Sequence, residues 1–196
     1  MKILWIEDNS NNIINMIFEN EMFNVLFTDS EIEKLKELQK TKYDGYDLAD
    51  LLESFNNSLY VVSSLIEAYE LIKKVRFDKF ILDIKFPLGR YFEYDMEKMV
   101  AEIMENQDLS FHTINQERYM GIVLNHLIVT KYEKEYGWNQ EMAENNIRFL
   151  TGNNENINSF ISKTNFKYNP TAKSVILLDK NNIKDFNKLI VWIESF

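Results

Sequence analysis

Short hydrophobic runs recur along the chain, and several of them are apolar at successive positions. The first run covers residues 3–6, and the others lie at 59–62, 77–84, 146–150 and 174–178. A run that is apolar on both sides suits a strand buried on both faces of a parallel sheet. Segments with helical spacing separate these runs, so the sequence predicts an α/β chain with a parallel sheet and helices on both faces.

The segments between the runs place apolar residues at the spacing of amphipathic helices. We expect Asp29 or Ser30 to cap one such helix and Ser63 or Ser64 to cap another. Residues 22–28 could form a further strand. The predicted helices cover residues 9–18, 31–40, 48–55, 66–72, 92–104, 121–132, 156–166 and 183–196.

Composition narrows the class of protein. The 196 residues include 31 acids and 22 bases, for a formal net charge of −9. This balance argues against nucleic-acid binding as the main activity, since a protein that binds the phosphate backbone needs a basic face. The absence of cysteine excludes disulfides, thiol nucleophiles and zinc–thiolate sites. No segment is long and apolar enough for a membrane helix, and acids at positions 7 and 8 exclude a signal peptide, so we expect a cytoplasmic protein without a membrane partner.

Polar side chains follow the predicted strands at their carboxyl ends, where ligands bind in parallel sheets. Three carboxylates crowded there would repel one another and bind a hard cation such as Mg²⁺. A lysine and a hydroxyl nearby suit the oxygens of a phosphoryl group, which a carboxylate can accept as an acyl phosphate. The residues concerned are Glu7, Asp8, Asp83, Thr151 and Lys180.

With these residues the chain resembles the receiver domain of two-component response regulators. The matching segments, in the order of the family, are ILWIEDN, VSSLIEAYELIKKVRFDKFILDIKFP, GIVLNHL, IRFLTG and VILLDK. Pro87 stands four residues after Asp83, and Gly121 begins the Gly-apolar-x-Leu pattern of a helix. The resemblance implies a doubly wound, five-stranded parallel sheet of flavodoxin-like type, with strand order 2-1-3-4-5 and helical insertions.

The resemblance also assigns roles at the strand ends. Asp8 and Asp83 would ligate Mg²⁺ with the backbone carbonyl of Lys85, and Glu7 would act directly or through water. Asp83 would be the phosphoacceptor. No Gly-rich nucleotide-binding motif occurs in the sequence.

In the same reading, Thr151 and Lys180 would bind the phosphoryl oxygens on Asp83. The donor would be a phosphohistidine on a sensor histidine kinase or a phosphotransfer protein. No output domain follows the last predicted helix, so we expect a stand-alone receiver that signals through contacts with a downstream protein rather than a dedicated enzyme. A homodimer is compatible with the family.

The chain departs from the receiver pattern at several positions. Asn181 follows the lysine where the family usually has a proline, and Leu177 replaces the aromatic switch residue. Lys85 brings an extra positive charge close to the acceptor, and Glu7 is longer than the usual aspartate. Two insertions, at about 29–58 and 88–119, interrupt a single receiver-like domain over 1–196.

Two other functions fit parts of this pattern. The first is a phosphorylation-independent pseudo-receiver, an interaction module whose insertions carry the binding surface. The second is a Mg²⁺-dependent phosphatase with Asp83 as nucleophile. Lys85 stands where such phosphatases have a second aspartate, which opposes the phosphatase reading.

Overall fold

The computed structural model describes residues 1–8, 26–41, 45–55, 59–89, 94–105, 120–151, 177–179 and 183–195. Two predicted helices, 9–18 and 156–166, lie outside the described residues. Lys180 and Asn181 also lie outside them.

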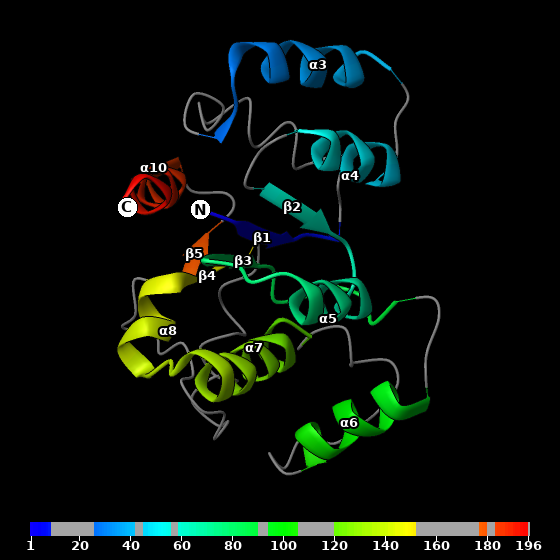
Figure 1. Cartoon of the computed structure of the whole chain (residues 1–196), viewed down its shortest axis with the longest axis vertical. Coiled ribbons are helices and arrows are strands. Elements are labelled where there is room, and N and C mark those ends of the chain that lie inside the picture. The colour runs from blue at the N-terminus through cyan, green and yellow to red at the C-terminus, as the bar shows by residue number, and fades with distance from the viewer. Residues whose placement is uncertain are drawn as a thin grey trace.

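One parallel sheet organises the described chain (Figure 1). Its five strands lie in the order β2-β1-β3-β4-β5, and each pair of neighbours is parallel. The strands are β1 (Ile3–Ile6), β2 (Leu59–Val62), β3 (Lys79–Leu82), β4 (Ile147–Thr151) and β5 (Leu177–Asp179). The predicted α/β chain with a parallel sheet is therefore confirmed.

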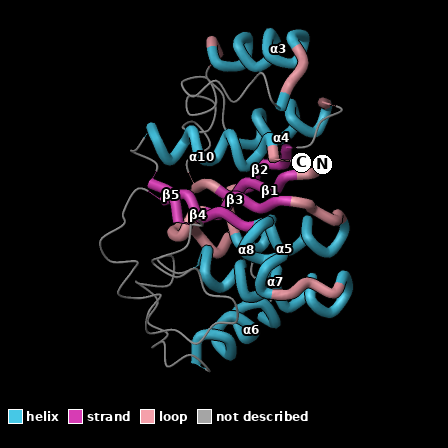
Figure 2. The backbone as a smooth tube through the Cα atoms, turned by 90° about the vertical axis from the view of Figure 1, so that its left-hand side faces the viewer, coloured by secondary structure: helices cyan, strands magenta, loops and turns pink. Residues whose placement is uncertain are grey.

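Helices cover both faces of the sheet (Figure 2). On one face lie α5, α7 and α8, with α6 packed outside α7; on the other lie α4 and α10, with α3 farther from the sheet. The bounds are α3 (Asp29–Gln39), α4 (Gly45–Ser54), α5 (Leu65–Lys74), α6 (Tyr94–Glu105), α7 (Met120–Tyr136), α8 (Gln140–Asn146) and α10 (Ile183–Glu194).

The apolar strands are explained by two hydrophobic cores, one on each face. In β1, Leu4 and Ile6 face the core under α5 and α7, while Ile3 and Trp5 face the core under α4 and α10. All four side chains are fully buried. Successive residues of a strand point to opposite faces, so a strand between two helical layers must be apolar throughout.

Several element boundaries differ from the sequence prediction. Thr28, not Asp29 or Ser30, caps α3: its side chain accepts the Glu31 N–H while the Glu31 carboxylate accepts the Thr28 N–H. This reciprocal capping box fixes the start of the helix. The suggested strand over 22–28 is wrong in its described part, because Leu26 is helical and Thr28 has become the cap.

The short helix α8 was not predicted, although its cap is visible in the sequence. Asn139 accepts the Met142 N–H at 2.9 Å, the bond expected of an N-cap asparagine. The helix ends at Asn146, so β4 begins at Ile147, one residue later than predicted. The strand β3 is also shorter than the run 77–84.

No described helix is long and apolar enough to cross a membrane.

Candidate acidic site at the carboxyl edge of the sheet

The acidic residues after β1 and β3 are held by backbone hydrogen bonds that continue the sheet beyond its strands. Glu7 donates its N–H to the Val62 carbonyl at 3.0 Å, and Asp83 donates its N–H to the Ile6 carbonyl at 3.0 Å. Adjacent parallel strands therefore present both residues at the same edge. Since the backbone is fixed on both strands, only side-chain rotation remains to set the positions of the carboxylates.

Three carboxylates converge at this edge. One oxygen each of Glu7, Asp8 and Asp83 lies within 4.8 Å of the other two. Glu7 is 2% exposed and Asp83 is 6% exposed, while Asp8 faces solvent. Like charges at this separation and burial repel strongly, and a hard divalent cation with oxygen ligands would neutralise them. The donor set thus fits Mg²⁺, with Asp8 open to water that such an ion retains.

The residues after Asp83 fold back onto its carboxylate. Asp83 Oδ1 accepts the Ile84 N–H at 2.6 Å, and the Lys85 N–H lies at 3.5 Å from the same oxygen. A charged acceptor strengthens such a bond and orients the carboxylate. The Lys85 side chain is exposed.

Backbone bonds from α5 hold the next part of this loop. The Leu65 N–H donates to the Pro87 carbonyl and the Ile66 N–H donates to the Leu88 carbonyl, both at 3.1 Å. The first amides of a helix have no partner within the helix. Here the loop after Asp83 supplies those partners, so the start of α5 and the acidic site form one hydrogen-bonded unit.

Gly121 brings α7 into direct contact with the same loop. Its N–H donates to the Ile84 carbonyl at 3.0 Å. A Cβ atom added at Gly121 would lie 2.1 Å from the Asp83 carbonyl oxygen and 2.8 Å from the Ile84 Cα. Any larger residue would collide with this backbone, so glycine is required by the close approach. The sequence match of Gly121 to the receiver pattern did not predict its contact with the backbone of Asp83 and Ile84.

The other residues expected at the site are placed only by their backbone or not at all. Thr151 ends β4 and pairs with Asp179, and Phe149 pairs with Leu82. The register thus brings the backbone of Thr151 to the same edge as Asp83. The side chains of Thr151 and Leu177 lie outside the described part of the chain, as does the whole of Lys180.

A second polar cluster, far along β3 from the acids, was missed by the sequence analysis. Lys79 and Arg148 both lie near the Trp192 ring, 4.6 and 4.7 Å from its centroid. Lys79 also donates to the carbonyls of Trp192 and Ile193 at the end of α10. Burial, with the neighbouring guanidinium, lowers the pKa of Lys79 to about 8, and burial lowers the pKa of Arg148 to about 10. The sequence feature that could have revealed this cluster is a basic residue inside each of two apolar strands, Lys79 in β3 and Arg148 in β4.

The acidic site combines three oxygen ligands for a hard cation with an Asp83 backbone bonded to β1 and a following loop that is bonded to α5 and α7. In comparisons with protein-family models, curated proteins and solved structures, nothing matches this chain.

Proposed function

We propose that the chain is a receiver domain of a two-component response regulator, in which Asp83 accepts a phosphoryl group in a Mg²⁺-dependent reaction. The observation that carries the proposal is the convergence of the Glu7, Asp8 and Asp83 carboxylates at one edge of the sheet. The strand order β2-β1-β3-β4-β5 supports it, because this is the flavodoxin-like order that the resemblance implies.

In this proposal an oxygen of Asp83 attacks the phosphorus of a phosphohistidine. The new O–P bond forms as the P–N bond breaks, and the histidine nitrogen takes up a proton. The bond from the Ile84 N–H to Oδ1 orients the carboxylate for this attack. Mg²⁺, when bound by the three carboxylates, supplies positive charge for the developing phosphoryl oxygens.

Thr151 and Lys180 are proposed to bind the phosphoryl oxygens. The backbone of Thr151 reaches the edge next to Asp83, and Lys180 directly follows the last residue of β5. The partners are a histidine kinase or phosphotransfer protein as donor and a downstream protein as target. The added dianion would alter the charge of this edge and, through it, the contact with the target.

One observation favours the alternative of a pseudo-receiver that works without phosphorylation. The carbonyls of Ile84, Pro87 and Leu88 already accept bonds from the first residues of α5 and α7. A loop held in this way keeps a fixed shape, which suits a constitutive binding surface. The two readings differ in whether Asp83 reacts.

The test is phosphorylation by acetyl phosphate with Mg²⁺, read by intact-protein mass spectrometry. We expect the wild type to gain the mass of one phosphoryl group and Asp83→Asn to gain none. Asp50→Asn is the matched control, because Asp50 is an exposed carboxylate on α4 and is not one of the three clustered acids. It should be phosphorylated like the wild type.

If the wild type binds Mg²⁺ but is not phosphorylated, the role of Asp83 as phosphoacceptor is refuted. The pseudo-receiver would then be the remaining interpretation. Equal modification of the wild type and Asp83→Asn would place the reactive group elsewhere. Loss of the mass shift on chelation of Mg²⁺ is a further required result.

A further inference from the structure

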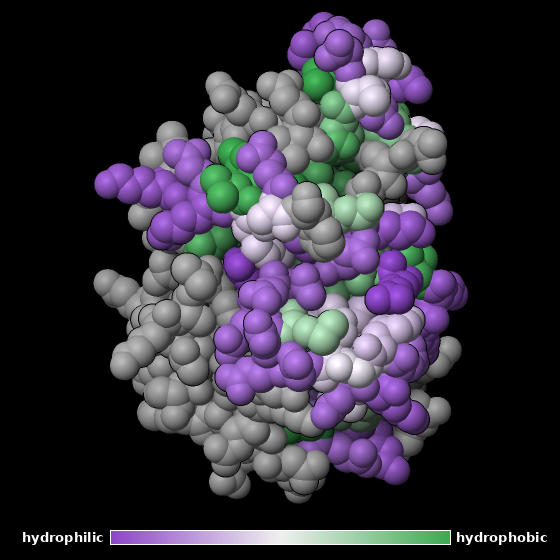
Figure 3. All heavy atoms as spheres, turned by 60° about the vertical axis from the view of Figure 1, so that its left-hand side comes forward, coloured by the Kyte–Doolittle hydropathy of each residue, from purple (hydrophilic) through white to green (hydrophobic). Residues whose placement is uncertain are grey.

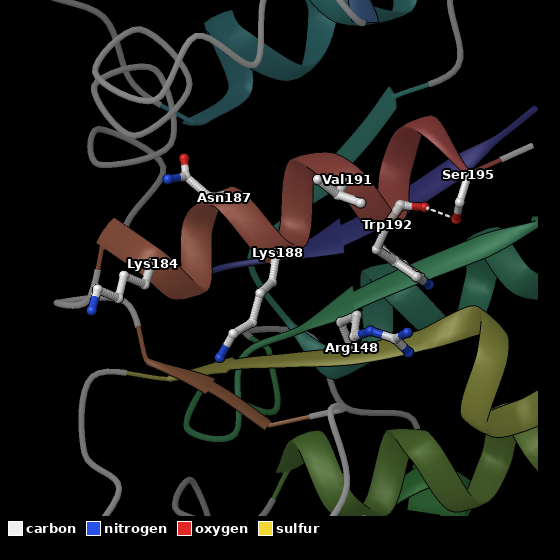
Figure 4. Close-up of a pocket in the computed structure, with 7 residues that line it drawn as sticks. All are labelled: Arg148, Lys184, Asn187, Lys188, Val191, Trp192 and Ser195. Carbon is white, nitrogen blue, oxygen red and sulfur yellow. Dashed lines mark hydrogen bonds between the residues drawn. The ribbon is translucent and has the colours of Figure 1, made fainter.

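A shallow groove runs beside α10, on the side that faces β4 (Figure 4). Its volume is about 450 Å³. Lys184, Lys188, Val191 and Trp192 come from the helix, and Arg148 comes from β4. Figure 4 shows Lys188 extending from the helix toward the strand that carries Arg148. We refer to this feature as the α10 groove.

Basic side chains line the α10 groove although the chain as a whole is acidic. Three of its seven lining residues are bases, and none of the seven is an acid. The chain as a whole carries a net charge of −9. Lys188 holds an ion pair with Asp185 at 2.6 Å, but it remains 61% exposed and can still meet a second anion.

Arg148 adds a buried positive charge at the floor of the groove. The residue is 9% exposed, and its Nη1 donates to the carbonyls of Glu144 and Ile147 at 2.6 and 2.8 Å. Within the described parts of the chain no carboxylate forms an ion pair with it. Carbonyl groups satisfy hydrogen bonds without neutralising the charge, and a cation kept from water attracts an anion. Lys79 lies at the same Trp192 ring and strengthens this field.

The groove also offers an apolar contact. Val191 is 64% exposed, the most exposed large hydrophobic residue of those described. Hydrophilic residues cover most of the described surface on the side shown in Figure 3, with small hydrophobic areas between them. A nucleic acid would need a wider basic face than three cations provide and would gain little from an aliphatic side chain.

We propose that the α10 groove is a docking site for an acidic segment of a partner protein. Carboxylates of the segment would meet Arg148 and Lys188, and an aliphatic side chain would lie on Val191. Charge complementarity favours this occupant over a second copy of the chain, whose net charge repels its own kind. Docking at the α10 groove requires no chemistry at Asp83, and the proposed phosphorylation assigns no role to this surface.

The test uses the whole chain and a short acetylated, fluorescently labelled peptide of glutamate and leucine. Fluorescence anisotropy measures its affinity without acetyl phosphate. We expect saturable binding that weakens about fivefold or more in Lys188→Glu, and that weakens as salt rises. Val191→Ser should weaken binding severalfold without affecting the fold, because this side chain is mostly in solvent.

The matched control is Lys36→Glu. Lys36 is exposed on α3 and pairs with Glu33 of its own helix three residues away, as Lys188 pairs with Asp185. The change in net charge is identical, so the control should bind the peptide within about twofold of the wild type. Circular dichroism would verify that all variants are folded.

Three results would overturn the proposal. One is no binding of the peptide by the wild type, and another is equal loss of affinity in the groove variant and the control. The third is tighter, groove-dependent binding of a single-stranded oligonucleotide, which would assign the groove to phosphate groups instead.

Discussion

Gly121→Ala would test the close approach of α7 to the acidic site. The added Cβ would lie 2.1 Å from the Asp83 carbonyl oxygen, whereas ordinary contact begins at 3.4 Å. The two backbones must therefore separate by about 1.3 Å, the difference between these distances. Forcing extra atoms into a packed interior costs about 1–3 kcal/mol, and the better helix propensity of alanine offsets less than about 1 kcal/mol.

We therefore expect Gly121→Ala to lower the free energy of unfolding by about 1–2 kcal/mol, measured by urea denaturation. The shift also acts on the Asp83 peptide, so Mg²⁺ affinity measured by calorimetry should fall by about tenfold. Gly137→Ala is the matched control. Gly137 has a φ of +69° and open space where a Cβ would go, so alanine there costs about 1 kcal/mol of backbone strain.

Gly137→Ala should leave Mg²⁺ binding unchanged, since this residue follows α7 at its far end. A Gly121→Ala protein as stable as the wild type would refute the close contact. A destabilised Gly121→Ala protein with unchanged Mg²⁺ affinity would refute the mechanical link between α7 and the acidic site.

Three further predictions concern single side chains. Tyr132→Phe removes the hydroxyl that accepts the buried Phe77 N–H at 2.7 Å, so it should lower the free energy of unfolding in urea by about 1–3 kcal/mol. Ser64→Ala removes the side chain that caps α5 and should cost about 1 kcal/mol in the same assay, whereas Ser54→Ala, at the exposed end of α4, should cost much less. Lys79 has its pKa lowered to about 8 from 10.5, so the unfolded chain binds more protons between these values and this residue makes stability rise with pH across that window. The stability of the wild type relative to Lys79→Met should accordingly increase from pH 8 to pH 10.5, by up to about 3 kcal/mol, and a flat difference would contradict the burial of the ammonium.

The strands could be predicted from the sequence because their hydrophobic pattern is local. Residues 3–6 and 59–62 were predicted with correct or nearly correct limits. Caps were harder, since Thr28, Asp29 and Ser30 are all good capping residues and only the side-chain geometry selects Thr28.

The convergence of the carboxylates was also predictable, because parallel strands end at a common edge. The sequence gives no distances, however, and tertiary contacts decide the rest. Nothing local in Gly121 indicates that its missing Cβ makes room for the Asp83 carbonyl. The pairing of Lys79 with the end of α10 joins residues 113 positions apart, so no periodicity could reveal it.

The most direct test of the acidic site is Mg²⁺ binding itself, measured by isothermal titration calorimetry at constant ionic strength. The convergence of Glu7, Asp8 and Asp83 predicts one site per chain in the wild type and in Asp50→Asn. It predicts an affinity about tenfold or more weaker in both Asp8→Asn and Asp83→Asn. A wild type that binds no Mg²⁺, or one whose affinity equals that of Asp83→Asn, would contradict the metal site and the phosphoryl transfer that depends on it.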